Sequence, residues 1–365
     1  MSTPSSREVL IWLNSLGVSH ANIHNLIQNF DHLSQLWIAN PNYINSIKTI
    51  KPEILSLILK YRNQKTLSDL FYVLGSQNIR PITFYDEEYP KTLNYINDYP
   101  KVLYTKGNIL EEDELAIGIV GARKATSYGK WACEKFTREL VDMGVTIVSG
   151  VAEGIDSVAH KTALDLGGRT IGVLGNGLDK VYPSKNKYLY EGISKNGALI
   201  TEFPLGTLPL AYNFPQRNRI IAGMSLGTIV IEAKEKSGSL ITAHYAMEQG
   251  KEVFALPGNI NNIYSGGTNR LIKDGARPLL DLDDIIEEIY ELQLLEIHNK
   301  KIKRDYSCLS NTELKIVKLI EEGPIHSDII SYKTGIDITT VISIMTILEL
   351  KGFIKELSSR TFTIC

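Results

Sequence analysis

Three glycine-bearing loops, each directly after a short apolar run, constrain the fold of this chain more than any other feature. The loops Gly121-Ala122-Arg123, Ser149 to Asp156 and Gly175 to Pro183 follow the apolar runs Ala116–Val120, Val145–Val148 and Thr170–Leu174. Each run has the length of a buried strand, and each loop precedes a segment able to form a helix. A unit of about thirty residues is typical of a doubly wound parallel sheet. We therefore expect the loops, and the function, at the carboxyl edge of such a sheet.

Further apolar runs extend this sheet. We expect strands at Ala198–Thr201, Gly227–Glu232 and Glu252–Ala255, and helices near Tyr188–Lys195, Leu240–Gln249 and Thr268–Asp274. A chain of 365 residues is too long for one compact core. We therefore predict an α/β fold in which an extended Rossmann-like domain, with a doubly wound and mostly parallel sheet, occupies residues 113–290.

The sequence before the sheet has a different periodicity. Apolar residues recur at helical spacing up to residue 76, which predicts a small N-terminal helical domain at 1–78. The turn Leu16-Gly17-Val18 leaves two interpretations, a SAM-like packing or interaction module and a helix-hairpin-helix-like module that binds a phosphate. Residues 79–112 are rich in Pro, Tyr and Asp, and we predict an extended connector packed on the sheet domain.

The chain changes character again after residue 290. A lysine-rich stretch predicts a linker at 291–305. The periodicity of 306–365 predicts three helices, at Thr312–Glu321, His326–Thr334 and Thr339–Lys351, and then a hairpin. This order is typical of a C-terminal winged helix-turn-helix domain. Because basic and acidic residues offset each other there, contact with DNA, contact with a protein and a structural role stay open.

Composition excludes several classes of protein. The formal net charge is −2, so any site for a polyanion must be a local patch. Cys133, Cys308 and Cys365 support neither a disulfide framework nor a zinc site, and we expect no metal. Apolar stretches are interrupted before membrane-spanning length, and no signal-type apolar core follows the first six residues. We expect a cytoplasmic protein.

The first two loops offer groups for a phosphate. Gly121 has no Cβ at the strand exit, and Arg123 stands where a helix should begin, so free amides and a guanidinium suit an anion there. The alternative is a tight turn at Gly121 and a carboxylate partner for Arg123.

The second loop contains another candidate, Gly150. Asp156 and His160 share a helical face, either as an acid–base dyad or as a structural cap beside a hydrogen-bonded histidine.

Two further segments place cations or amides at helix starts. Lys185 and Lys187 follow the third loop, where they either reach a polyanion or form a solvated surface. Ser237, Gly238 and Ser239 precede a helix and would form an amide-rich corner for an anion.

The run from residue 213 to residue 219 combines an aromatic ring with cations and amides. Its candidate contacts are Phe214, Arg217, Asn218 and Arg219. Such a combination suits base stacking and phosphate contact on a single strand. The alternatives are core packing for the phenyl ring and ion pairs with Glu202 or Glu232 for the two arginines.

Motifs for nucleotide chemistry are incomplete or missing. Gly175-Asn176-Gly177 lacks the third glycine of the dinucleotide fingerprint, and the sequence contains no Gly-Lys-Ser/Thr phosphate loop and no nucleophile elbow. An NAD enzyme or an ATPase has little support, and we expect no cofactor.

Taken together, these segments resemble the DprA/Smf family, bacterial DNA-processing proteins of natural transformation. The likeness covers about residues 85–280. Its motifs are Gly121-Ala122-Arg123, Ser149-Gly150-x-Ala152-x-Gly154-Ile155-Asp156, Ala159-His160, the Gly175 to Pro183 run, Thr201-Glu202, Asn213-Phe214-Pro215 with Arg217-Asn218-Arg219, Glu232-Ala233, Ser237 to Thr242, and Pro257-Gly258. So many ordered motifs do not coincide by chance.

The resemblance implies a domain that binds single-stranded DNA, forms a homodimer and helps to load a RecA-type recombinase onto incoming strands, without a catalytic reaction. It implies that Arg123 holds a backbone phosphate and that Lys187 and Lys185 extend the track. Arg217 and Arg219 would line the same pocket. For the homodimer, the resemblance suggests contact through residues 259–280.

Two other classes of function stay open. An enzyme that cleaves a ribosyl bond, as in the lysine decarboxylase-like group, would use Leu226-Gly227-Thr228 and Glu232, although the glycine set of that loop is incomplete. A pure adaptor would bind proteins through its two ends and hold a free nucleotide only as a signal.

Overall fold

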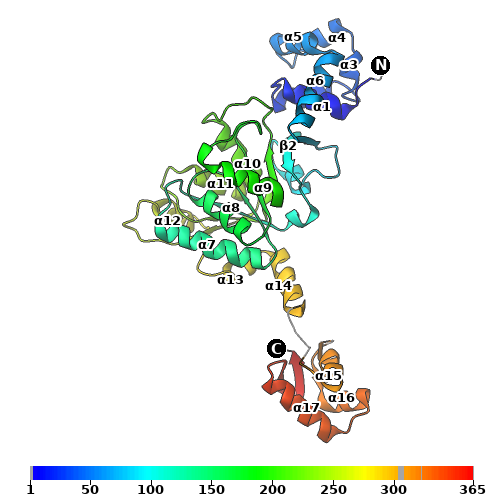
Figure 1. Cartoon of the computed structure of the whole chain (residues 1–365), viewed down its shortest axis with the longest axis vertical. Coiled ribbons are helices and arrows are strands. Elements are labelled where there is room, and N and C mark those ends of the chain that lie inside the picture. The colour runs from blue at the N-terminus through cyan, green and yellow to red at the C-terminus, as the bar shows by residue number, and fades with distance from the viewer. Residues whose placement is uncertain (1–2, 303–307, 322, 365) are drawn as a thin grey trace. The chain divides into compact units, whose positions relative to one another are not determined.

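The structure is a computed structural model that describes residues 3–302, 308–321 and 323–364. It consists of two compact units, Met1–Glu296 and Ile297–Cys365, which are described one at a time (Figure 1). Helix α14 (Tyr290–Ile302) crosses the boundary between them. Cys365, one of the three cysteines considered above, lies outside the described residues.

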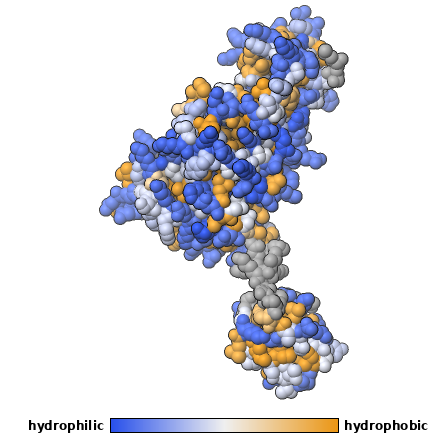
Figure 2. Space-filling view, viewed as in Figure 1, coloured by the Kyte–Doolittle hydropathy of each residue, from blue (hydrophilic) through white to orange (hydrophobic). Residues whose placement is uncertain are grey.

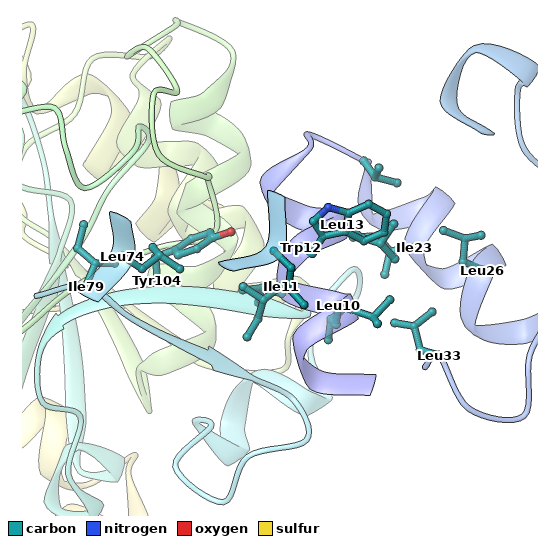
Figure 3. Close-up of a cluster of buried hydrophobic side chains, with 14 of the residues drawn as sticks. Leu10, Ile11, Trp12, Leu13, Ile23, Leu26, Leu33, Leu74, Ile79 and Tyr104 are labelled. Carbon is teal, nitrogen blue, oxygen red and sulfur yellow. The ribbon is translucent and has the colours of Figure 1, made fainter. Parts of the chain in front are cut away.

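Six short helices form the N-terminal part of the first unit. They are α1 (Ser6–Ser15), α2 (His20–Gln28), α3 (Gln35–Ile38), α4 (Pro41–Asn45), α5 (Pro52–Tyr61) and α6 (Gln64–Ser76). Trp12 meets Trp37 edge to face, with 5.0 Å between the ring centroids. Figure 3 shows Trp12 in a buried cluster with Leu10, Leu13, Ile23 and Leu26. This apolar cluster holds the short helices together.

The helical bundle packs directly on the sheet domain. The bundle core continues to Tyr104 on strand β2 (Val102–Gly107) and to Leu189 on helix α9 (Lys187–Asn196). The Tyr104 hydroxyl donates a hydrogen bond of 2.8 Å to Oδ1 of buried Asn14. Bundle and sheet therefore belong to one compact unit.

A nine-stranded sheet forms the centre of the first unit. Its strands are β1 (Arg80–Thr83), β2, β3 (Ala116–Val120), β4 (Thr146–Ser149), β5 (Thr170–Val173), β6 (Gly197–Thr201), β7 (Gly227–Val230), β8 (Glu252–Ala255) and β9 (Arg277–Pro278). Their spatial order is β1-β2-β6-β5-β4-β3-β7-β8-β9. Strands β3 to β9 pair in parallel, whereas β2 pairs antiparallel with both of its neighbours, β1 and β6. The predicted doubly wound, mostly parallel sheet is confirmed.

Helices cover both faces of the sheet. On one face lie α7 (Ser127–Asp142), α8 (Ile155–Asp165), α9 and α13 (Asp283–Ile286), and on the other α10 (Asn213–Met224), α11 (Gly238–Glu248) and α12 (Gly266–Lys273). Three 3-10 turns, η1 (Lys91–Tyr95), η2 (Glu111–Glu114) and η3 (Ser184–Asn186), lie in the connections. Along β3, Ile117 and Ile119 face the first layer and Ala116 and Val120 face the second. This alternation of a strand with period two produces two separate cores.

The chain reverses its direction of winding at β3. From β3 it proceeds through β4 and β5 to β6 on one side, and β7 then pairs with the other side of β3. Connections that diverge in this way leave a crevice at the carboxyl ends of the two strands. The loops after β3 and after β7 border that crevice.

The second unit is a winged-helix domain, as the periodicity of the tail predicts. It contains α15 (Asn311–Glu321), β10 (Ile325–His326), α16 (Ser327–Thr334), α17 (Ile338–Leu350), β11 (Ile354–Ser358) and β12 (Thr361–Ile364). Gly335 ends α16 in the left-handed region, with φ of +69°. Strands β10, β12 and β11 form a small antiparallel sheet.

Three stretches differ from the sequence-based expectation. Residues 79–112 are not only a connector, because they supply β1 and β2 to the sheet. Helix α14 occupies most of 291–305, since Leu292 and Leu295 pack on the core of the sheet domain; residues 303–305 lie outside the described residues. The run 213–224 is helical, which the sequence did not suggest. The described residues include no helix with the length and apolar character needed to cross a membrane.

Candidate functional site

Three adjoining hollows lie at the crevice between β3 and β7. They have volumes of about 460, 190 and 320 Å³. Arg123 lines all three, Phe214 lines the first two, and Glu153 lines the last two. Because the hollows share these residues, they form one continuous depression, here called the edge groove.

The edge groove is strongly cationic although the whole chain is not. Its lining contains two carboxylates, Glu153 and Asp156, and the seven cations Arg123, Lys124, Lys130, Lys185, Arg217, Lys234 and Lys236. The formal net charge of the chain is −2. A local excess of positive charge in a concave site concentrates anions there.

Close contact with the start of α8 fixes the backbone of the Arg123 loop. Gly154 has φ of +87°, and a Cβ there would lie 2.5 Å from the Arg123 carbonyl oxygen. The Ile155 amide donates a hydrogen bond of 3.2 Å to the carbonyl oxygen of Ala122. At Gly121, a Cβ would lie 2.7 Å from the Ile155 side chain. The glycine we expected to open room for a phosphate thus makes room for α8, and the Arg123 guanidinium remains exposed.

Aromatic rings lie beside the Arg123 guanidinium. Its central carbon is 5.7 Å from the centroid of the Phe214 ring, and the Arg217 guanidinium lies 6.0 Å from the same ring. Tyr182 packs against Phe214 with 5.6 Å between centroids. Gly175 allows this arrangement, since a Cβ there would lie 2.8 Å from the phenyl ring. Within the described residues, no carboxylate forms an ion pair with Arg123.

A buried guanidinium forms the floor of the groove. Arg217 is 4% exposed and donates a hydrogen bond of 2.8 Å to the Gly150 carbonyl oxygen and another to that of Val173. A Cβ at Gly150 would lie 2.5 Å from Nη2 of Arg217, so a larger residue would displace this group. Burial lowers the pKa of Arg217 to about 10, while the Asp156 charge opposes the shift. The guanidinium therefore stays charged at neutral pH.

The start of α11 forms another part of the lining. Ser237 caps the helix by accepting a hydrogen bond from the Ser239 amide, and Gly238 lies between them. The Asn218 side chain donates a hydrogen bond of 3.2 Å to the Gly238 carbonyl oxygen and so ties α10 to this corner. All four residues line the groove, so the structure brings these candidate residues together. The start of α11 carries the positive end of the helix dipole, which favours an anion there.

Arg219 does not line the groove, contrary to our expectation. Residues two apart on a helix point to opposite sides, so Arg219 faces away from Arg217. Both of its terminal nitrogens lie 2.7 Å from the carboxylate oxygens of Glu202. His20 Nε2 lies 2.9 Å from the same carboxylate, at the contact between bundle and sheet. The alternative pairing with Glu202 is thus the one observed, and Arg219 is a structural residue.

The two predicted lysines, Lys185 and Lys187, differ in their position relative to the groove. Lys185 lines the groove, although its ammonium lies 3.6 Å from the carboxylate of Glu153. Lys187 is exposed at the start of α9 but does not line any of the three hollows. Four further lysines of the groove are not among the residues that the sequence predicts: Lys124, Lys130, Lys234 and Lys236. Lys124 follows Arg123 directly and Lys236 directly precedes Ser237, whereas the fold brings Lys130 and Lys234 to the groove.

Asp156 and His160 do not form a dyad. His160 is fully buried, and its Nδ1 lies 2.7 Å from the Thr170 hydroxyl. Burial lowers the pKa of His160 to about 3, so the ring is neutral at neutral pH. Burial raises the pKa of Asp156, and the nearby Arg217 charge opposes that shift. The geometry supports the structural interpretation of this pair.

Within residues 3–302, 308–321 and 323–364, no cluster of three His, Cys, Asp or Glu side chains is arranged for a metal ion.

A larger hollow of about 730 Å³ lies near η1 and η2 but has the opposite charge. Its lining contains one lysine, Lys91, and the six carboxylates Asp86, Glu87, Glu88, Glu111, Asp113 and Glu114. Such a lining repels phosphate groups. Size alone therefore does not identify the anion site.

The winged-helix domain presents a helix without basic residues where related domains read DNA. Helix α17, the second helix of its helix-turn-helix, contains no Lys or Arg. Exposed apolar side chains lie on this domain, at Ile329, Tyr332, Ile347, Leu350 and Leu357, and Figure 2 shows apolar surface on the second unit. A DNA-reading helix usually carries basic residues. Among the roles left open by the sequence, contact with a protein fits this surface better than contact with DNA.

Comparisons with known proteins agree with the motifs in the sheet domain. The family model described as DNA recombination-mediator protein A matches residues 80–290, which is more than half of the chain. The chain belongs to the DprA/Smf family. A second family model, the DprA winged helix domain, matches residues 304–359.

Several members of the DprA/Smf family are similar over most of the chain. The DNA processing protein DprA of Bacillus subtilis is 41% identical over 248 residues, which are 68% of this chain and 79% of that protein. Protein Smf of Escherichia coli is 35% identical over 94% of this chain and 92% of its own length. The similarity therefore includes the helical bundle and the winged-helix domain as well as the sheet.

Two solved structures share the fold. DprA from Streptococcus pneumoniae superposes with a TM-score of 0.69 at 34% identity, over 79% of this chain and 99% of that one. DprA from Helicobacter pylori, whose structure concerns its single-stranded DNA binding mode, gives a TM-score of 0.53 at 32% identity, over 58% of this chain and 96% of that one.

Proposed function

We propose that this chain binds single-stranded DNA in the edge groove, without sequence preference and without catalysing a reaction on it. The observation that carries the proposal is the lining of the groove, which combines seven cations with the Phe214 ring, and two of these cations, Arg123 and Arg217, lie beside that ring. Proteins that bind single strands commonly combine cations along the nucleic-acid backbone with aromatic rings that stack on the bases. The H. pylori relative, which is studied for its single-stranded DNA binding mode, supports the same assignment.

A chain of phosphates fits the groove better than one nucleotide. The lining extends from Ser237 at the start of α11, past Arg123, to Lys185 near the start of α9. A nucleotide cofactor would use one of the three hollows and leave the other cations without a partner. We infer that successive phosphates occupy successive hollows.

Competition between ligands tests this proposal. A labelled oligothymidine of about 20 nucleotides should bind tightly, and unlabelled thymidine monophosphate or ATP in large excess should not displace it, because only the oligonucleotide spans several hollows. Displacement by the free nucleotide would support the adaptor class instead. Release of free base from a nucleoside monophosphate would support the ribosyl-cleaving enzyme.

We further propose that the protein acts as a homodimer that protects single strands and loads a RecA-type recombinase. Within residues 259–280, the large apolar side chains Ile260, Ile263 and Leu280 are 89, 62 and 65% exposed, which favours a protein contact there. If the protein loads the recombinase, its addition should speed the assembly of recombinase filaments on oligonucleotides that are already covered by a single-strand binding protein. A variant unable to hold DNA in the groove, such as Arg123→Ala, should lose that effect.

A further inference from the structure

We propose that Tyr128 and Trp131, on the first two turns of α7, form a second base-stacking site that continues the edge groove. The inference rests on the proposed function, since it extends the same strand beyond the three hollows. It assigns a role to two residues that none of the motifs discussed above includes.

The two rings form an ordered and exposed pair. Their centroids are 6.1 Å apart and their planes are inclined by 25°, so they stack on each other. Tyr128 is 47% exposed and Trp131 is 59% exposed. The Tyr128 hydroxyl donates a long hydrogen bond of 3.4 Å to the Pro257 carbonyl oxygen, which anchors the pair on the loop after β8. An exposed tryptophan held in a fixed orientation offers a flat surface to a planar ligand.

The pair is continuous with the groove through α7. Residues 123–125 line the groove, Thr126 caps the helix, and Lys130 lines the third hollow. At 100° per residue, Trp131 projects between the direction of Lys130 and that of Tyr128. A strand that leaves the third hollow past Lys130 and crosses the exposed face of α7 therefore reaches the Trp131 ring.

The chemistry around the rings suits a nucleotide. Lys124 and Lys130 are exposed and can neutralise phosphates on the groove side of the pair. The open ring faces can stack on any base, because each base has a π-face. The structure therefore assigns to this site one or two further bases of a single strand, bound without sequence preference.

A length series of oligothymidines separates this site from the groove. For Trp131→Ala, we expect about tenfold weaker binding of a 20-nucleotide strand, which corresponds to about 1.4 kcal/mol, and unchanged binding of the shortest strand that the groove alone holds. Trp131→Phe should restore most of the loss, because it keeps a stacking ring. Tyr72→Ala removes an aromatic residue that is 78% exposed on α6 and serves as the matched control, with no expected effect.

Fluorescence gives a second measurement on the wild-type chain. The tryptophans are Trp12, which is buried, Trp37, which is partly buried, and Trp131, so quenching by DNA reports mainly on the last. Quenching should begin only at strand lengths greater than the groove holds.

The failures of the two proposals are distinguishable. If Arg123→Ala loses affinity but Trp131→Ala matches the wild type at every length, the stacking site is wrong and the groove assignment stands. If Trp131→Ala changes the sedimentation coefficient and not the affinity, the pair is a protein contact and this inference fails. If Arg123→Ala leaves affinity unchanged at every length, both proposals are overturned.

Discussion

Glu202 and Arg219 form a buried ion pair at the contact between bundle and sheet, and Arg219→Met tests whether this arginine is structural. The two residues are 2% and 4% exposed, and both terminal guanidinium nitrogens of Arg219 lie 2.7 Å from carboxylate oxygens of Glu202. The variant removes one partner and leaves the Glu202 carboxylate with His20 alone. Breaking a buried pair in this way costs about 3–5 kcal/mol, because the remaining charge loses its guanidinium partner and stays buried.

The dependence of this effect on pH follows from the pKa of Glu202. Burial opposes ionisation, but His20 and Arg219 together hold the pKa below its ordinary value. A carboxyl with a lowered pKa in the folded state contributes stability above its unfolded pKa, of about 4.3, and loses it as the pH falls through the folded value. In the Arg219→Met variant, the Glu202 carboxyl can instead take up a proton, which removes the buried charge. The difference from the wild type should therefore be largest near pH 7 and shrink toward pH 4.

Urea unfolding followed by tryptophan fluorescence measures this difference. All three tryptophans, Trp12, Trp37 and Trp131, belong to the first unit, so the signal does not report on the winged-helix domain. The double variant Arg219→Met with Glu202→Gln should recover more than about 1 kcal/mol, as expected for directly coupled groups. An unchanged midpoint together with a tenfold loss of oligonucleotide affinity would refute the structural role and return Arg219 to the DNA site.

Three further predictions concern the groove, the tail and self-association. Gly154→Ala should lower the free energy of unfolding by about 1 kcal/mol or more, since φ is +87° at this position. The new Cβ would also press on the Arg123 loop, so the variant should bind oligothymidine severalfold more weakly. A variant with wild-type affinity would contradict the role of that contact. Deletion of residues 306–365 should change the affinity by less than about twofold in a filter-binding assay, because α17 carries no cation, and a tenfold loss would assign DNA contact to the tail. Ile260→Asp with Leu280→Asp should lower the sedimentation coefficient toward that of a monomer by burying charge in an apolar contact, and an unchanged value would place the dimer contact elsewhere.

The sheet and its crevice were predictable because parallel strands are buried on both faces. Runs such as Ala116–Val120 are continuously apolar, so they stand out from the loops that follow. The first strand-loop-helix unit then identified the Arg123 loop, which the structure places at the junction of the three hollows. For the strands and the Arg123 loop, the local sequence pattern and the overall fold therefore indicate the same residues.

Helix α10 and much of the groove lining were not predictable in the same way. Arg217, Asn218 and Arg219 are consecutive and all buried, so the helix has no polar outer face to reveal its period. Their partners, among them Glu202, are distant in sequence. Lys130 belongs to no recognisable motif, and only the reversal of winding at β3 brings it to the same crevice as Lys234.

The salt dependence of oligothymidine binding tests the groove most directly. For a single strand, the slope of log K against log salt concentration is about −0.7 for each phosphate neutralised. We predict a steep slope for the wild type, a weaker affinity and a slope reduced by about 0.7 for Arg123→Ala, and no change for Lys106→Ala, whose lysine is exposed on β2 outside the groove. An affinity and a slope unchanged by Arg123→Ala would show that the edge groove does not hold the strand.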